Sequence, residues 1–327
     1  MEKKRNWKEY NERLVRRGEI LISMDFIENW EKELEEMNKN KRGRPYEYPN
    51  SFMQFLAFLY IAFLPFRQLE GFLRGLSKYI PKLKAADYTT IFKRLKKIEI
   101  EFPLQELDND IIVAIDSTGM KVSSRGEWIR HKWKVKKGWV KVHVAVDVKT
   151  KKLLALEITD ERTGDGKMLQ PLIKQAKRNS KGKKIRSVYA DGAYDSRDNF
   201  NFLDKEGIEP IIKTRKNAST RARGSPARAE KVREVRKIGY EGWKDKYKYG
   251  NRWATETFFS GVKRIFGETS KAKSVEGVFQ EVKLKFLFYN MVVELVKSLL
   301  LFDNLFKRSS FIQLFNKAHH VETFIYF

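Results

Sequence analysis

The spacing of hydrophobic and polar positions changes near residue 109. Before that point, short apolar segments alternate with turn residues, and the spacing over 49–100 is typical of three or four short helices. Residues 1 to about 44 are polar, with a helical pattern, and end in a basic loop. Asp87 is expected to cap one of these helices, because aspartate is favoured at N-cap positions. The pattern therefore predicts an all-helical N-terminal region over 1–105.

Two interpretations of this helical region remain open. It has the size and helix spacing of a helix-turn-helix unit, which would insert one helix into the major groove of DNA. It also fits a plain helical bundle that packs against the rest of the chain or dimerises. The pattern favours neither, so a DNA-binding or dimerisation region is the expectation.

After residue 109 the pattern becomes that of alternating strands and helices. Apolar runs and period-two alternation predict strands, and the longer amphipathic segments predict helices. The expected order is a strand over 111–116, strands over 139–147 and 153–159, a helix over 166–179, a strand over 185–190, a helix over 196–206 and a strand over 208–213. The first three strands read as an antiparallel meander, and the whole predicts an α/β fold with a mixed five-stranded sheet flanked by helices.

The remainder of the chain is less regular. Residues 214–248 form a basic insertion whose first part is rich in small residues, and alone it would be disordered or ordered only on a polyanion. A long helix is expected to begin near Asn251, and a second apolar helix after residue 280. The sheet domain would then cover 106–300, followed by a C-terminal tail over 301–327.

No membrane span is predicted. The longest apolar stretch, Met53 to Phe66, has about 14 residues, whereas a bilayer-spanning helix needs roughly 20. Charged residues interrupt the apolar segment 283–302, and no apolar signal core follows the N-terminus. The expected location is the cytoplasm.

Composition narrows the class of partner. The chain has 327 residues, 67 Lys and Arg against 42 Asp and Glu, and a formal net charge of +25. Such an excess implies a polyanionic partner, most commonly nucleic acid. A simpler explanation of the charge is adaptation of the protein to an unusual cytoplasm. Cysteine is absent, which excludes disulfides and thiolate metal sites.

Three acidic residues stand where a metal-dependent DNA-cutting enzyme would need them. Asp116 ends the apolar run from Ile111, and Asp191 follows a second apolar run that ends at Ala190. Glu256 lies within the long helix near Asn251. Three such carboxylates can hold two divalent cations, which is the arrangement that phosphodiester cleavage favours.

The helix that carries Glu256 has two different faces. At about 100° per residue, Tyr249, Arg252, Glu256 and Lys263 fall within an arc of roughly 60°. The opposite, apolar arc contains Ala254, Phe258, Val262 and Ile265. One face is therefore expected to dock on the sheet and the other to present charges. An ordinary amphipathic helix with an Arg252–Glu256 surface pair is the simpler alternative.

Other candidates receive weaker roles. Phe259 and Phe266 lean toward the charged face and could floor a nucleotide pocket. Asp195 and Asp198 are most simply first-turn acids that suit the helix dipole, and Asp165 is a runner-up for a supporting role. The histidines lack metal-site spacing, and they are His131, His143, His319 and His320.

The spacing Tyr249-x2-Arg252-x3-Glu256-x6-Lys263 resembles the signature of DDE-type insertion-sequence transposases with a Tyr-Arg-Glu-Lys motif. The blocks around Asp116 and Asp191 look like the first and second aspartates of that family. Further blocks resemble its family five branch, within the insertion-sequence-four superfamily; they are Gly43-Arg44-Pro45, Arg67-Gln68-Leu69-Glu70, and the segment from His131 to His143. The resemblance covers about residues 40 to 295.

This resemblance implies an RNase H-like fold, in which Asp116, Asp191 and Glu256 hold two Mg²⁺ (or Mn²⁺) ions about 4 Å apart. The implied enzyme cuts the ends of its own element and joins the 3′-hydroxyl ends to target DNA. Arg252 and Lys263 would neutralise phosphates, while Tyr249 would position a phosphate or stack on a base. The implied partners are double-stranded DNA, with terminal inverted repeats and a target, and a second copy of the chain in the DNA complex.

Two rival functions remain. The chain could be a catalytically decayed relative that still binds DNA. It could also be an RNase H-like nuclease or resolvase, which uses similar acids. Arg252 and Lys263 beside Glu256 favour the transposase.

Overall fold

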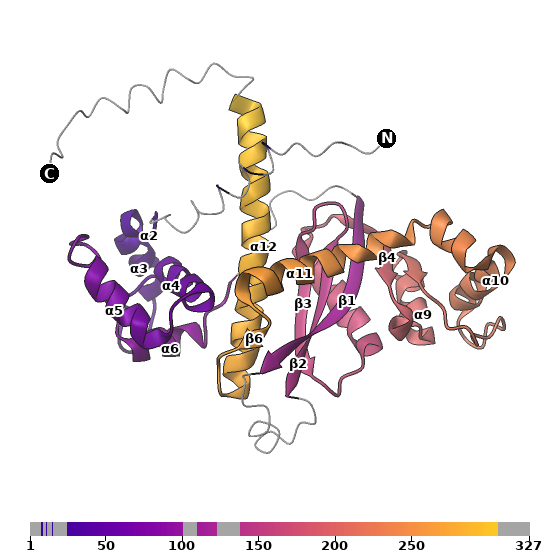
Figure 1. Ribbon diagram of the computed structural model, residues 1–327, viewed down its shortest axis with the longest axis horizontal. Coiled ribbons are helices and arrows are strands. Elements are labelled where there is room, and N and C mark those ends of the chain that lie inside the picture. The colour runs from indigo at the N-terminus through magenta and orange to yellow at the C-terminus, as the bar shows by residue number, and fades with distance from the viewer. Residues whose placement is uncertain are drawn as a thin grey trace. The chain divides into compact units, whose positions relative to one another are not determined.

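The computed structural model describes residues 25–100, 110–122 and 138–306, together with Lys8, Asn11 and Val15 (Figure 1). Contacts divide the chain into two units. One unit is Met24–Asn290, and the other comprises Met1–Ser23 and Met291–Phe327. The predictions made for His131, for the terminal His319 and His320, and for the C-terminal tail lie outside the described residues.

The N-terminal part of the unit Met24–Asn290 is helical, as the sequence predicts. Its helices are α2 (Asp25–Glu28), α3 (Trp30–Asn38), α4 (Asn50–Ala62), α5 (Phe66–Leu76) and α6 (Tyr88–Leu95). Helix α4 is apolar and largely buried, and it stops before Pro65, so the longest apolar stretch is a core helix. The predicted cap is confirmed, because the Asp87 carboxylate accepts hydrogen bonds from two backbone N–H groups at the start of α6.

A mixed sheet forms the centre of the following part of the chain. Its main strands are β1 (Asp110–Val122), β2 (Trp139–Asp147), β3 (Leu153–Asp160), β4 (Lys184–Ala190) and β5 (Glu209–Ile212), in the order β3-β2-β1-β4-β5. Strand β2 is antiparallel to both neighbours, whereas β4 and β5 run parallel to β1. A two-residue strand, β6 (Thr269–Ser270), pairs with the far end of β1. An antiparallel meander followed by parallel strands is the RNase H-like arrangement, so the predicted fold class is confirmed.

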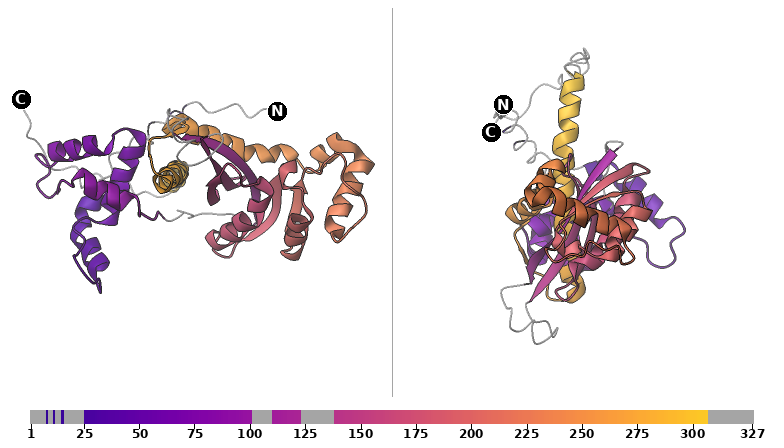
Figure 2. Two further views of the ribbon diagram at one scale, coloured as in Figure 1. Left: turned by 90° about the horizontal axis from the view of Figure 1, so that it is seen from below. Right: turned by 90° about the vertical axis from the view of Figure 1, so that its right-hand side faces the viewer.

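Helices cover both faces of the sheet, because alternate residues of a strand point to opposite sides. The helical elements of this part of the chain are η2 (Asp165–Met168), α8 (Leu169–Asn179), η3 (Gly192–Tyr194), α9 (Arg197–Lys205), α10 (Pro226–Lys246), η4 (Tyr249–Trp253), α11 (Ala254–Phe266) and α12 (Val275–Phe306). Val113 and Ile115 of β1 pack in one core cluster with residues of α8 and α9. Ala114, between them, packs in a second cluster with Trp243 and Tyr249. Figure 2 shows the strands between these layers.

Side-chain amides cover the outer edge of β3. Gln175 of α8 accepts a hydrogen bond from the Leu156 N–H at 2.6 Å, and Asn179 donates to the Leu154 carbonyl at 2.7 Å. Asn290 of α12 accepts from the Leu153 N–H at 2.8 Å. These amides provide hydrogen-bond partners that β3 would otherwise take from a further strand.

The basic insertion is ordered by long-range contacts. The Asp195 carboxylate accepts from the Arg215 N–H at 2.9 Å, and Arg236 of α10 donates to the Ala218 carbonyl at 2.9 Å. Residues 226–246 form α10, which kinks at Gly239, where φ is 75°. The prediction of disorder concerned this segment alone, whereas in the structure it has hydrogen-bond partners in Asp195 and in α10.

Two charges in the apolar segment of α12 are buried as a pair. Lys285 lies 3.7 Å from Glu281, and its ammonium donates to the Thr269 carbonyl at 2.8 Å. Glu281 accepts from the backbone N–H groups of Lys271 and Ala272.

Among the helices that the structure describes, none combines the length and apolarity of a membrane span.

Candidate active site

The first two acids lie side by side where β4 ends, next to the middle of β1. Strands β1 and β4 are parallel neighbours, and Ala114 pairs with Tyr189. Asp116 and Asp191 each follow these partners by two residues, so the register places them level with each other. The Asp191 carboxylate caps η3 by accepting from the Ala193 N–H at 2.8 Å. The Asp116 carboxylate accepts from the Ser117 N–H at 2.8 Å.

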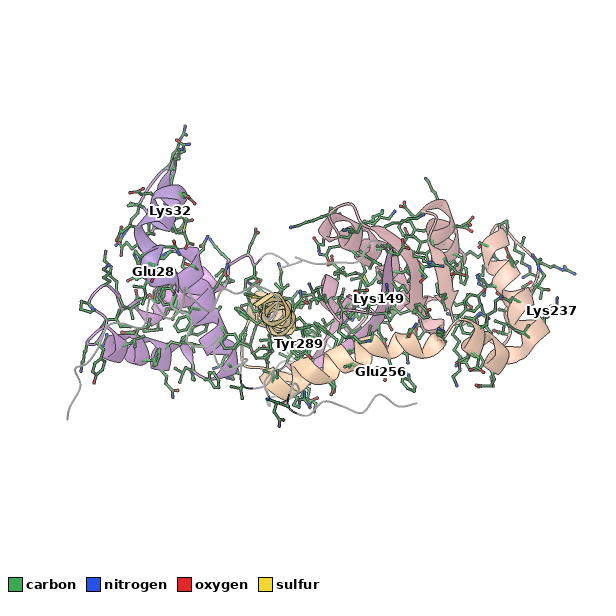
Figure 3. The ribbon with its side chains drawn as sticks, turned by 90° about the horizontal axis from the view of Figure 1, so that it is seen from above. Glu28, Lys32, Lys149, Lys237, Glu256 and Tyr289 are labelled. Atoms are coloured by element: carbon green, nitrogen blue, oxygen red, sulfur yellow. The ribbon has the colours of Figure 1, made fainter. Side chains whose placement is uncertain are left out.

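Arg252 connects the third acid, Glu256, to Asp116. Glu256 lies in the first turn of α11 and is labelled in Figure 3. Arg252, in η4, donates from Nη1 to Asp116 Oδ2 and from Nη2 to Glu256 Oε1, both at 2.7 Å. The Asp116 and Arg252 side chains are only 18% and 19% exposed, whereas Glu256 is 53% exposed. The guanidinium therefore joins two carboxylates that are distant in sequence.

Opposing effects act on the pKa of the Asp116 carboxyl. Burial raises the pKa of the Asp116 carboxyl, and the nearby charges of Asp191 and Glu256 raise it further. The Ser117 N–H and the Arg252 guanidinium act in the other direction, but burial prevails. The pKa of Arg252 rises because its acidic neighbours outweigh the effect of burial, which lowers it. The arginine is thus the cation that offsets the crowding of negative charge.

Tyr249 lies elsewhere than the helical arc predicts. The chain over Tyr249–Trp253 is a 3-10 turn, and the α-helix begins only at Ala254, so the angular spacing of an α-helix does not apply there. Tyr249 is buried, and its hydroxyl donates to the Ala190 carbonyl at 2.9 Å. This bond ties the start of α11 to the residue that precedes Asp191.

The two phenylalanines are core residues. Phe259 and Phe266 are 7% and 6% exposed, and they pack against Phe286 and Phe58. They therefore leave no exposed ring for a base, and the nucleotide-pocket interpretation is wrong. Ile265, placed on the apolar arc by the sequence, is 37% exposed.

The remaining acids have structural partners. Asp195 is buried and makes a bidentate ion pair with Arg228, at 2.6 and 2.9 Å, so it is not a first-turn acid. Asp198 does lie in the first turn of α9. Asp165 lies 3.0 Å from Lys141 Nζ.

Two residues near the site were missed by sequence reasoning. Tyr194 is buried, and within the part of the chain that the structure describes its hydroxyl has no hydrogen-bond partner. Thr255 is fully buried beneath Asp116, and its hydroxyl donates to the Arg252 carbonyl at 2.9 Å. Their only sequence signal is adjacency to Asp191 and Glu256, which does not distinguish them from core residues.

The donor set suits a hard divalent cation by type. Asp116, Asp191 and Glu256 offer carboxylate oxygens, which Mg²⁺ prefers. The positions of these side chains do not match an ion site, since no group of three or more such side chains among the described residues is placed to hold an ion. Arg252 explains the difference, because its nitrogens hold the Asp116 and Glu256 oxygens that a cation would bind.

Comparisons with known proteins find several similar chains. A curated but uncharacterised protein of Aquifex aeolicus (strain VF5) is 28% identical over 294 residues, covering 82% of this chain and 84% of its own. Among solved structures, the piggyBac transposase synaptic complex with hairpin DNA is 11% identical, with a TM-score of 0.39, over 87% of this chain and 74% of that chain. The Drosophila P element transposase strand transfer complex is 9% identical, with a TM-score of 0.31, over 84% and 86%.

Family models give the assignment. One model described as a transposase DDE domain matches residues 15–125, and another with the same description matches residues 108–291. The second match covers more than half of the chain and contains Asp116, Asp191 and Glu256. This chain therefore belongs to the transposase DDE domain family.

Proposed function

We propose that this transposase cuts the ends of its own insertion sequence and joins the freed 3′-hydroxyl ends to target DNA. The observation that supports the proposal is the contact between Arg252 and two of the acids. Asp116 and Glu256 share this guanidinium, and Asp191 directly follows β4, the strand beside Asp116.

In the proposed reaction, Asp116, Asp191 and Glu256 hold two Mg²⁺ (or Mn²⁺) ions. When bound, the ions supply the activation of water and the stabilisation of the leaving 3′ oxygen. The protein supplies rigidity, because the Ser117 and Ala193 N–H groups orient the carboxylates of Asp116 and Asp191. The second oxygen of Asp191 remains for the ions, whereas the second oxygen of Asp116 accepts a hydrogen bond from Arg252 in the free protein.

DNA is the proposed partner. The net charge of +25 favours a polyanion, and a guanidinium pairs well with phosphate through two parallel hydrogen bonds. Arg252 and Lys263 are proposed to contact phosphates of the cleaved end. Tyr249 is buried and uses its hydroxyl inside the protein, so we propose that it positions the residue before Asp191 rather than contacting DNA.

The larger assembly follows from the reaction. Two element ends must be held together, so we propose a homodimer in the complex with terminal inverted repeats and target DNA. The helical region 1–105 is proposed to contribute DNA binding or dimerisation to the catalytic domain 106–300. The proposed location is the cytoplasm.

The test uses labelled DNA from both flanks of the gene, incubated with the protein in Mg²⁺ and in EDTA. Wild type is expected to cut at defined positions in Mg²⁺ only, and Asp116→Ala and Glu256→Gln are expected to bind DNA without cutting it. Adding a plasmid then tests joining, since a nuclease or resolvase does not insert the cut end.

Each result has a distinct reading. Cutting together with insertion supports the proposal. Cutting without insertion favours the nuclease. Salt-sensitive binding with no cutting under either condition favours a decayed DNA-binding protein. If Glu256→Gln cuts DNA as well as wild type does, Glu256 takes no part in the reaction.

A further inference from the structure

Arg252 occupies the position where the two acids could share an ion. One of its terminal nitrogens contacts Asp116 and the other contacts Glu256, each at 2.7 Å. Both contacts are charge-assisted, and the side chain is largely buried. The same oxygens cannot bind this guanidinium and also ligate a small divalent cation at about 2.0–2.1 Å, because the two cations would overlap and repel.

We infer that Arg252 is a resident counter-cation that keeps divalent ions off Asp116 and Glu256 until a DNA phosphate draws it away. This inference rests on the proposed function only in taking these acids as the ion-binding groups. It adds a thermodynamic link, namely that ion binding and DNA binding strengthen each other through the position of a single side chain.

The direction of the link follows from charge balance. Without any cation, Asp116 would face Asp191 and Glu256 in a partly buried setting, and like charges so placed repel. Arg252 relieves that repulsion in the free protein. A phosphodiester offers the guanidinium an alternative bidentate partner, and the vacated carboxylates then attract a divalent cation. Each ligand therefore removes the cost that opposes the other.

The local structure allows Arg252 to move without unfolding the site. Arg252 lies in the short 3-10 turn η4, ahead of α11, and Glu256 is more than half exposed. The turn itself is anchored independently by the Tyr249 hydroxyl on the Ala190 carbonyl. A change of side-chain rotamer at Arg252 can therefore release both carboxylates while the backbone of the turn stays in place.

The test is Mn²⁺ binding measured by calorimetry on the full chain, with and without a short DNA duplex, after subtraction of the Mn²⁺ that the duplex binds alone. Arg252→Gln is expected to bind Mn²⁺ more tightly than wild type when DNA is absent, by roughly 5- to 150-fold, the usual range of such couplings. The duplex is expected to strengthen Mn²⁺ binding to wild type by a similar factor and to Arg252→Gln much less.

Three variants control the experiment. Arg264→Gln removes the same charge from an exposed position of the same helix and is expected to match wild type. Arg252→Lys retains the charge but cannot bridge two carboxylates in the same way, so an intermediate affinity is expected. Adding Asp116→Ala to Arg252→Gln is expected to abolish the gain. Thermal melts establish that each variant is folded.

Equal Mn²⁺ affinity of wild type and Arg252→Gln without DNA would overturn the inference. So would a gain that Arg264→Gln reproduces, or one that persists after Asp116→Ala. These outcomes are separable from the failure of the proposed function, which is measured by cutting and joining. If the protein cuts and joins DNA but Arg252→Gln leaves the Mn²⁺ affinity unchanged, only the coupling between ion binding and DNA binding is refuted.

Discussion

Gly261 is the position at which one added methyl group should disturb the fold most clearly. It lies inside α11, five residues after Glu256, and a Cβ there would meet Tyr289 Oη at 1.9 Å and Cζ at 2.2 Å. Carbon atoms pack best at about 3.5–4.0 Å, so α11 and Tyr289 must separate by more than 1 Å, roughly estimated from these distances. Tyr289 is itself held edge-on against Phe258, at 4.8 Å between ring centroids.

The expected magnitude combines two opposing effects. Overpacking a core contact costs about 1–3 kcal/mol, and this contact is closer than most, so the upper end applies. Alanine gains about 1 kcal/mol over glycine within a helix. Gly261→Ala should therefore lower the free energy of unfolding by about 2 kcal/mol. In a Tyr289→Ala background, the clash disappears, and the same substitution should become stabilising by up to about 1 kcal/mol.

Urea denaturation of the four proteins of this double-mutant cycle provides the measurement. Gly71→Ala in α5 is the matched control, since nothing lies within 4 Å of its added Cβ, and it should be neutral or stabilising. A neutral or stabilising Gly261→Ala in the wild-type background would refute the reasoning. The same effect of Gly261→Ala in both backgrounds would also refute it.

Other predictions concern single interactions, all measurable by urea denaturation. Asp87→Ala removes the cap of α6 and should cost about 1 kcal/mol, whereas Asp87→Asn should cost less. Burial lowers the pKa of His143 to about 4, from an ordinary 6.5. The folded state then binds fewer protons than the unfolded state between these values, so the free energy of unfolding should fall by about 3 kcal/mol as pH drops from 6.5 to 4. His143→Gln should flatten that dependence, and an unchanged slope would contradict it. Asp195→Ala leaves the Arg228 guanidinium unpaired, which should cost about 3–5 kcal/mol, and replacing both residues by apolar ones should cost less.

The sheet could be predicted from local pattern because each strand carries its own signal. Residues 139–147 alternate, and the run that ends at Asp116 is continuously apolar, as suits a central strand covered on both faces. The observed β1 continues to Val122, beyond the predicted end. The polar and small residues Ser117, Thr118 and Gly119 interrupt the apolar run, so the sequence does not mark the continuation of the strand to the buried Met120 and Val122.

The site was predictable in its acids but not in its detail. A carboxylate after a buried strand is visible in sequence, and so is the four-residue spacing of Arg252 and Glu256. The bond from Arg252 to Asp116 is not visible, because it joins residues 136 positions apart. Tyr249 was assigned to the charged face since the sequence does not mark where the 3-10 turn gives way to α-helix.

Buried charges were the other limit. Lys285 reads in the sequence as a surface interruption of an apolar helix, yet it is 1% exposed beside Glu281. The backbone groups of residues 267–272 satisfy this pair, and local spacing contains no information about them. Asp195 was misassigned for the same reason, since its partner Arg228 belongs to an element 33 positions away.

The amides along β3 have a consequence for how copies of the protein meet one another. An open edge strand is a template on which another chain can add a strand, and such additions lead to aggregation. Gln175, Asn179 and Asn290 already engage the outward N–H and carbonyl groups of Leu153, Leu154 and Leu156. At these three residues the hydrogen-bonding groups of β3 are already occupied, so a neighbouring molecule cannot extend the sheet there by adding a strand.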